Sequence, residues 1–196
     1  MIERPSSRKL IQDSLKELLK TKTIEEITVT QIAGNCAMSA RAFYYHFHDK
    51  HEVVSSIYSD EMRQYMSRPL DLWYEQINAF FGRESAYFKN SLVYTGQNNL
   101  METIKQIDRE KILMHIKSSN SDDVLYKRIL MGLEYMLCGN AGLTYNGFLN
   151  PSCFANSSEV SAGYSSLTLW EILTQLFPPI MMENLSLPVV NPQPNL

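Results

Sequence analysis

The sequence predicts an all-α protein in which three short helices are followed by a larger helical unit. Two observations predict this class. Between Ser7 and Ser67 the chain has one glycine and no proline, and apolar residues recur at intervals of three and four. That spacing places apolar side chains on one face of a helix. Beyond Pro69, longer stretches with the same period predict a second helical unit.

Length and charge limit the possible functions. A chain of 196 residues can bury a core without disulfides or metals. Its net charge of -3 argues against a protein that coats nucleic acid over its whole surface. Residues 1–50 carry eight Lys and Arg against six Asp and Glu (+2), whereas residues 51–196 carry ten against fifteen (-5). This division is expected if only the N-terminal segment meets phosphates.

Nothing in the sequence indicates a membrane or an oxidising compartment. No apolar run approaches the roughly 20 residues of a membrane span. The N-terminus "MIERPSSRKL" is charged where a signal peptide is apolar. Cys36, Cys138 and Cys153 are odd in number, far apart and outside any CxxC pair. We therefore expect a cytoplasmic protein with reduced thiols.

The first two helices are predicted from their apolar residues and start signals. The first begins near Ser6 or Ser7, and its apolar stripe is Leu10, Ile11, Leu15, Leu18 and Leu19. Thr28 is expected to cap the second helix, with Gln31 as its partner in a capping box. The hydrophobic staple that accompanies this start is Ile27 with Ile32.

The next two helices begin with the same kind of signal. Ser39 would cap a helix over residues 40–47, with Met38 and Phe43 as the staple. Asp49 would cap a fourth helix. Its apolar stripe is Val53, Val54, Ile57, Tyr58, Met62, Tyr65 and Met66.

The rest of the chain is predicted to be helical with one long loop and a tail. The expected helices are 70–81, 84–94, 98–117, 121–146 and 158–177. Residues 145–159 are rich in Asn and Ser and form the most loop-like interior segment. Five prolines after residue 177 predict a tail that is disordered or extended.

The second and third helices are spaced as in a helix-turn-helix, with about three residues between them. The first helix of such a motif braces the second, which presents side chains to the DNA major groove. The order "TVTQIAGNCAMSARAFYYHFHDKHEVV" resembles the signature of the TetR family of bacterial transcription regulators. The matching residues are Thr28, Val29, Ile32, Ala33, Ser39, Tyr44, His46, Phe47 and Lys50. The resemblance implies a helix-turn-helix DNA-binding domain over residues 1–50. It also implies a helical effector-binding and dimerisation domain over 51–180 and a flexible tail over 181–196.

The resemblance also implies roles for individual residues. Tyr44 would contact a phosphate and a sugar or thymine methyl group, while His46 and Lys50 hold the DNA backbone. Arg41 would face base edges, where arginine can bridge guanine O6 and N7. Its alternative role is a surface salt bridge, and Tyr45 fits either core or surface. The predicted DNA-binding set is Thr28, Thr30, Gln31, Ser39, Ala40, Arg41, Tyr44, Tyr45, His46 and Lys50.

One residue departs from the family pattern. Ala37 stands where the family has a turn glycine, and a left-handed backbone there would cost an alanine about 1 kcal/mol. The orientation of the second helix of the motif depends on this turn.

Other chemistries are less compatible with the spacing. His46, His48 and His51 lie across a helix break, so their imidazoles should not converge on a metal. Cys36 is expected to be a small buried thiol rather than a nucleophile. The sequence contains no paired-carboxylate or nucleophile and base pattern, so we expect no enzyme activity, cofactor or metal.

Residues 80–104 resemble the effector domain of the TetR branch that regulates dihydroxyacetone kinase operons. Aromatic and Met residues at helical spacing could line an effector pocket, although core packing is the more common meaning of such stripes. The candidate pocket residues are Phe80, Phe81, Tyr87, Phe88, Tyr94, Met101, Met114, Tyr135 and Met136.

The family resemblance also implies a homodimer, in which helices 121–146 and 158–177 of each subunit form a four-helix bundle. The candidate interface residues are Gly132, Gly139, Leu167, Trp170, Leu173 and Phe177. We therefore expect a repressor that a small-molecule effector releases from a palindromic operator. The alternative is an activator or co-regulator whose C-terminal domain binds a partner protein.

Overall fold

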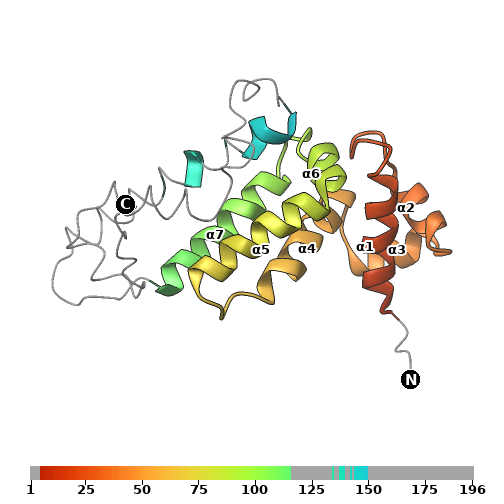
Figure 1. Cartoon of the computed structure of the whole chain (residues 1–196). Coiled ribbons are helices and arrows are strands. Elements are labelled where there is room, and N and C mark those ends of the chain that lie inside the picture. The colour runs from red at the N-terminus through yellow and green to blue at the C-terminus, as the bar shows by residue number, and fades with distance from the viewer. Residues whose placement is uncertain (1–4, 116–133, 135–136, 140–141, 143, 150–196) are drawn as a thin grey trace, which may run out of the picture.

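The computed structural model describes residues 5–115, 134, 137–139, 142 and 144–149, and this part of the chain contains helices and no strand (Figure 1). The helices are α1 (Ser7–Leu18), α2 (Val29–Asn35), α3 (Ala40–His46), α4 (Lys50–Arg63), α5 (Leu70–Arg83), α6 (Ser85–Ser91) and α7 (Leu100–His115). This architecture confirms the all-α fold class.

The four predicted N-terminal starts are confirmed, whereas the later boundaries shift. α3 ends one residue before the predicted end at Phe47, whose backbone is extended. The predicted helix 84–94 is shorter, and 98–117 begins at Leu100. Of the predicted helix 121–146 the structure describes residues 134, 137–139, 142 and 144–146. These are helical, and the helical state continues through residue 149, so the loop predicted over 145–159 does not begin at residue 145. The predicted helix 158–177 and the tail lie outside the described residues.

Helix α1 forms because its cap and its apolar stripe agree. The side chain of Ser6 accepts a hydrogen bond from Lys9 N at 3.2 Å, which satisfies one of the free amides of the first turn. Ile11, Leu15 and Leu19 are fully buried. The buried face of α1 therefore packs against α2 and α4.

Helix α4 joins the two parts of the fold. Its cap Asp49 accepts a hydrogen bond from Glu52 N at 2.8 Å. The helix packs against α1 and also against α7. In Figure 1, α1–α3 lie on one side of α4, and α5 and α7 lie on the other. We call α1–α3 the N-terminal unit and α5–α7 the C-terminal unit.

Aromatic rings fill the interior next to α4. The rings of Phe88 and Phe81 lie 4.5 Å apart, and those of Phe88 and Phe80 lie 5.2 Å apart, both edge to face. Tyr58 of α4 and Phe148 also contact this cluster. These distances are typical of aromatic core packing.

The C-terminal unit also buries polar groups. Lys111 is buried, and its ammonium donates hydrogen bonds to the carbonyl oxygens of Met66, at 2.8 Å, and Arg68. Asp108 and Trp73 are buried nearby, on α7 and α5. None of the described helices combines the length and apolar character needed to cross a membrane.

Candidate nucleic-acid interface

Helix α2 is locked at its start by a reciprocal capping box. The Thr28 side chain accepts a hydrogen bond from Gln31 N at 3.2 Å, and the Gln31 side-chain oxygen accepts one from Thr28 N at 2.9 Å. Two amides that would otherwise lack partners are satisfied together. Because the Gln31 oxygen is engaged, its amide nitrogen is the group left to face solvent.

The turn after α2 is a Schellman motif with alanine in the left-handed position. Ala37 has φ 55°, which is the left-handed conformation expected of the turn glycine that it replaces in the family pattern. Met38 N donates to Ala33 O at 2.8 Å, and Ala37 N donates to Gly34 O at 3.1 Å. The turn therefore keeps the glycine-type backbone despite the strain of a Cβ atom.

A buried polar contact holds α2 against α1. Ser14 Oγ donates to Ile32 O at 2.7 Å, and Asn35 Nδ2 donates to Ser14 Oγ at 3.2 Å. Ser14 is 5% exposed and its bond to Ile32 lies in the interior, whereas the bond from Asn35 is partly exposed. Sequence reasoning did not assign this contact. The available signal was a serine beside Leu15, inside the apolar stripe of α1.

Helix α3 separates its packing residues from its exposed residues. Ser39 caps the helix by accepting from Ala42 N at 3.1 Å. Phe43 is fully buried, whereas Tyr44 and Tyr45 are 57% and 86% exposed. Tyr45, for which the sequence allowed either position, therefore lies on the surface. Arg41 is also exposed, one helical turn before Tyr45.

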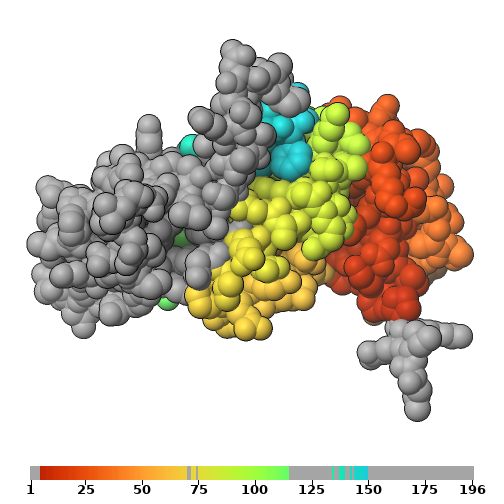
Figure 2. All heavy atoms as spheres, viewed as in Figure 1, coloured from red at the N-terminus to blue at the C-terminus, as the bar shows by residue number. Residues whose placement is uncertain are grey.

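The remaining predicted DNA-binding residues are exposed or half-buried. Thr28, Thr30, Gln31 and Ser39 are exposed at the starts of α2 and α3. Ala40 and His46 are half-buried, and the His46 ring meets the Tyr45 ring edge to face at 5.1 Å. In Figure 2 the N-terminal unit, in red and orange, forms one end of the molecule.

The segment that carries these residues has no acidic side chain. From Ile27 to His48 the sequence contains no Asp or Glu. Three of the nearby acids accept hydrogen bonds from the backbone: Glu26 from Thr23 N at 2.8 Å, Asp49 from Glu52 N at 2.8 Å and Glu52 from His48 N at 2.6 Å. A segment with one arginine and no carboxylate does not repel phosphates.

Lys50 differs from the expected phosphate ligand. Its ammonium donates to the carbonyl oxygens of Ile24, Glu25 and Ile27 at 2.7, 3.2 and 2.8 Å. An ammonium group has three donors, so all three are occupied. Burial lowers the pKa of Lys50. In the structure this lysine braces the segment before α2, and its expected contact with the DNA backbone stays a prediction.

The groups considered for other chemistry lie apart. Within the described residues, no three His, Cys, Asp or Glu side chains are grouped so that they could hold a metal ion. The His51 ring stacks on Tyr94 at 3.7 Å, and burial lowers the pKa of His51. The thiol of Cys36 donates to Ile32 O at 3.3 Å and to Ala33 O at 3.4 Å.

The candidate effector residues do not form one group. Phe80, Tyr87 and Phe88 are buried, and Phe81 packs against them in the aromatic cluster. Tyr94 stacks on His51 instead, Met101 is half-buried, and Met114 is 62% exposed. Tyr135 and Met136 lie outside the described residues. Of the candidate dimer residues, Gly139 is exposed, and Gly132, Leu167, Trp170, Leu173 and Phe177 lie outside the described residues.

Comparison with known proteins supports the fold. No family model matches the chain, and no curated protein matches its sequence. A solved structure described as "Dihydroxyacetone kinase operon activator DhaS" is similar to it, with a TM-score of 0.59 and 14% sequence identity. The match covers 91% of this chain and 98% of that chain. The similarity supports the TetR-like fold that the sequence predicts.

Proposed function

We propose that this chain is a sequence-specific DNA-binding transcription regulator of the TetR type. The observation that carries the proposal is the exposed face of α3. Arg41, Tyr44 and Tyr45 face outward from a helix whose start is capped and whose inner side is packed. Large exposed aromatics on a short, well-anchored helix are costly to leave in water and are suited to contact a partner.

The chemistry of this face suits a DNA groove. The Arg41 guanidinium can bridge guanine O6 and N7, which contributes roughly 1 to 3 kcal/mol of discrimination. Tyrosine rings can pack on sugars and thymine methyl groups while their hydroxyls donate to phosphates. Thr30 and Gln31, exposed at the first turn of α2, add further donors beside α3. No role as an enzyme is proposed.

One short helix per subunit provides little affinity, so we propose that the protein acts as a homodimer. A two-fold dimer places two α3 helices about 34 Å apart, which is one turn of duplex DNA. The operator would then be a palindrome. The site of action would be the cytoplasm, and the regulated state would depend on an effector bound by the helices beyond residue 51.

The sign of regulation has two candidates. A repressor released by a small-molecule effector follows from the general TetR pattern. The similar solved structure is named as an operon activator, which favours an activator. In that alternative the C-terminal unit would bind a partner protein. A reporter gene placed behind the operator separates the two, because removing a repressor raises transcription and removing an activator lowers it.

Selection of bound duplexes from a randomised pool, followed by affinity measurements at several salt concentrations, tests the proposal. We expect affinity to fall steeply with salt, because bound counterions are released from the DNA. Arg41→Ala should weaken binding to the selected duplex by about tenfold or more. Arg68→Ala removes another exposed arginine, between α4 and α5, and should change the affinity less than about twofold. If the wild-type protein retains no duplex even at low salt, the proposal fails.

A further inference from the structure

Helix α6 of the C-terminal unit is bonded to the segment that joins α1 to α2. We call residues 19–27 the connection. The side chain of Asn90 donates from Nδ2 to Leu19 O at 2.7 Å. The backbone carbonyl of the same residue accepts from Ile24 N at 2.9 Å. One residue of α6 thus contacts both the end of α1 and the middle of the connection.

The opposite side of the connection is held by α4. The Lys50 ammonium donates to three of its carbonyl oxygens, those of Ile24, Glu25 and Ile27. Ile24 therefore takes part in both contacts: its amide bonds to Asn90 and its carbonyl to Lys50. The connection is fixed between α6 and α4, at the point where the chain enters the N-terminal unit.

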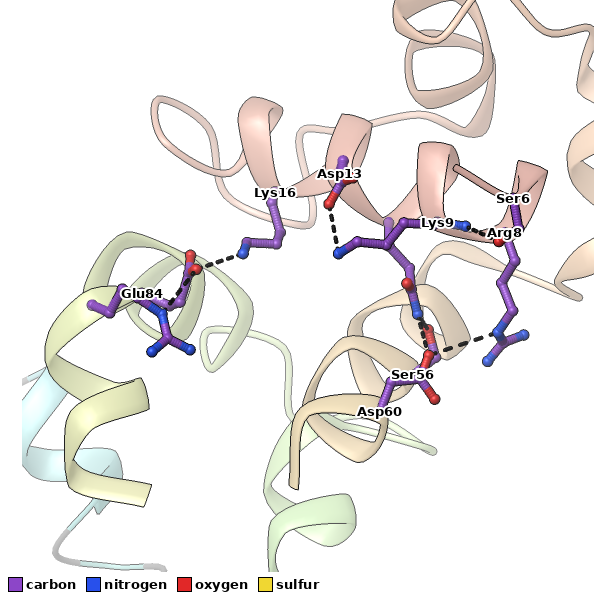
Figure 3. Close-up of polar contacts among 10 residues, drawn as sticks. Ser6, Arg8, Lys9, Asp13, Lys16, Ser56, Asp60 and Glu84 are labelled. Carbon is purple, nitrogen blue, oxygen red and sulfur yellow. Dashed lines mark hydrogen bonds and ion pairs between the residues drawn. The ribbon is translucent and has the colours of Figure 1, made fainter. Parts of the chain in front are cut away.

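Further polar contacts tie α1 to the rest of the molecule (Figure 3). The Lys16 ammonium lies 2.5 Å from a carboxylate oxygen of Glu84, the residue just before α6. Gln12 Nε2 donates to Ser56 Oγ at 2.9 Å and to Asp60 Oδ2 at 2.6 Å, both on α4. The α6 contact at Asn90 therefore acts on a helix that is already held in place.

The connection is stiff enough to carry a displacement to α2. Ile24 and Ile27 are fully buried, so the segment cannot lift from the core without exposing apolar surface. Within it, Glu26 N donates to Thr23 O at 3.1 Å and the Glu26 carboxylate accepts from Thr23 Oγ1 at 2.8 Å. Ile27 is followed directly by Thr28, the cap of α2. A shift at the connection moves the start of the helix-turn-helix.

We propose that Asn90 is a positioning residue through which α6 sets the placement of α2 and α3, and with it the affinity for DNA. This inference rests on the proposed function, because it names how the DNA-contacting face is regulated. A change in the C-terminal unit that moves α6 displaces Leu19 and Ile24. The route runs through the connection and is separate from the packing of α4 on α7.

Two variants of Asn90 and one control test this. Asn90→Ala removes the amide, and Asn90→Asp keeps the side-chain volume but removes the donor. Asn99 provides the control, because its Nδ2 donates to Gly96 O at the same 2.7 Å and its Oδ1 caps α7 by accepting from Glu102 N. Asn99→Ala should therefore lower the free energy of unfolding about as much as Asn90→Ala, without removing a contact to the connection.

The measurements are affinity for the selected duplex and amide hydrogen exchange of the free protein. We expect both Asn90 variants to bind the duplex about tenfold more weakly, a typical size for coupling between sites, and Asn99→Ala to bind within about twofold of wild type. Exchange of α2 and α3 amides should accelerate in the Asn90 variants alone.

Two results would overturn the inference: equal duplex affinities in the Asn90 and Asn99 variants, or exchange in α2 and α3 that does not respond to Asn90. If the wild-type protein binds no duplex, the proposed function fails instead. The exchange measurement then still decides whether Asn90 controls the placement of α2 and α3.

Discussion

The N-terminal and C-terminal units treat buried polar groups differently. Around α1, the buried side chains of Gln12, Ser14 and Ser56 all have hydrogen-bond partners. Between α5 and α7, by contrast, Trp73 Nε1 and Asp108 Oδ1 are buried without a well-formed hydrogen bond in the described part of the chain. Full pairing favours one fixed geometry, whereas buried groups without a well-formed bond leave free energy to be gained by a proton, a water or a ligand. The first property suits the DNA contact that we propose for the N-terminal unit, and the second suits the regulation that we propose for the C-terminal unit.

Replacement of Asp108 is expected to change stability more than any other substitution considered. Burial raises its pKa to about 7, and the nearby Trp73 indole offsets part of the rise. The folded protein therefore holds a proton that the unfolded chain releases near its ordinary pKa of 3.8, so stability should fall as pH rises from about 4 to about 7.

Asp108→Asn should remove that slope, stabilising the protein by on the order of 3 kcal/mol at pH 8 and by little at pH 4. Urea unfolding at the two pH values measures this. A gain of equal size at both values would mean that the carboxyl does not titrate in this range, and the contrast between the two units would lose its main support.

Lys50→Met tests whether this lysine braces the connection that leads into α2. The substitution removes three hydrogen bonds from a charged donor. We expect the free energy of unfolding to fall by about 2 kcal/mol, a value discounted because the group is half-exposed. If Lys50 braces the connection, the slope of log affinity against log salt should stay as in wild type. A slope smaller by about one unit would instead indicate a lost phosphate contact.

Ala37→Gly should have the smallest effect. Glycine relieves the strained left-handed backbone at φ 55°, partly offset by the greater freedom of the unfolded chain. We expect a stabilisation of about 0.5 kcal/mol, measured as a higher urea midpoint with an unchanged m-value. Destabilisation would show that the Cβ of Ala37 contributes packing that outweighs the strain.

The sequence by itself determined the helix starts of the N-terminal unit. A cap and its partner are three residues apart, so Ser6, Thr28, Ser39 and Asp49 could be identified without knowledge of the fold. The left-handed turn at Ala37 was expected only from the resemblance to a family whose turn has a glycine at this position. Helices α5 and α6 have no side-chain cap bond, and their boundaries moved.

Only the tertiary structure decided the roles of residues whose partners are distant in the chain. The three carbonyls that Lys50 binds lie 23 to 26 residues away, and the carbonyl that Asn90 binds lies 71 residues away. Helical periodicity assigns a residue to a face but says nothing about what packs on that face. A lysine on the surface and a lysine that braces a connection therefore have the same sequence signal, and the contacts made on folding separate them.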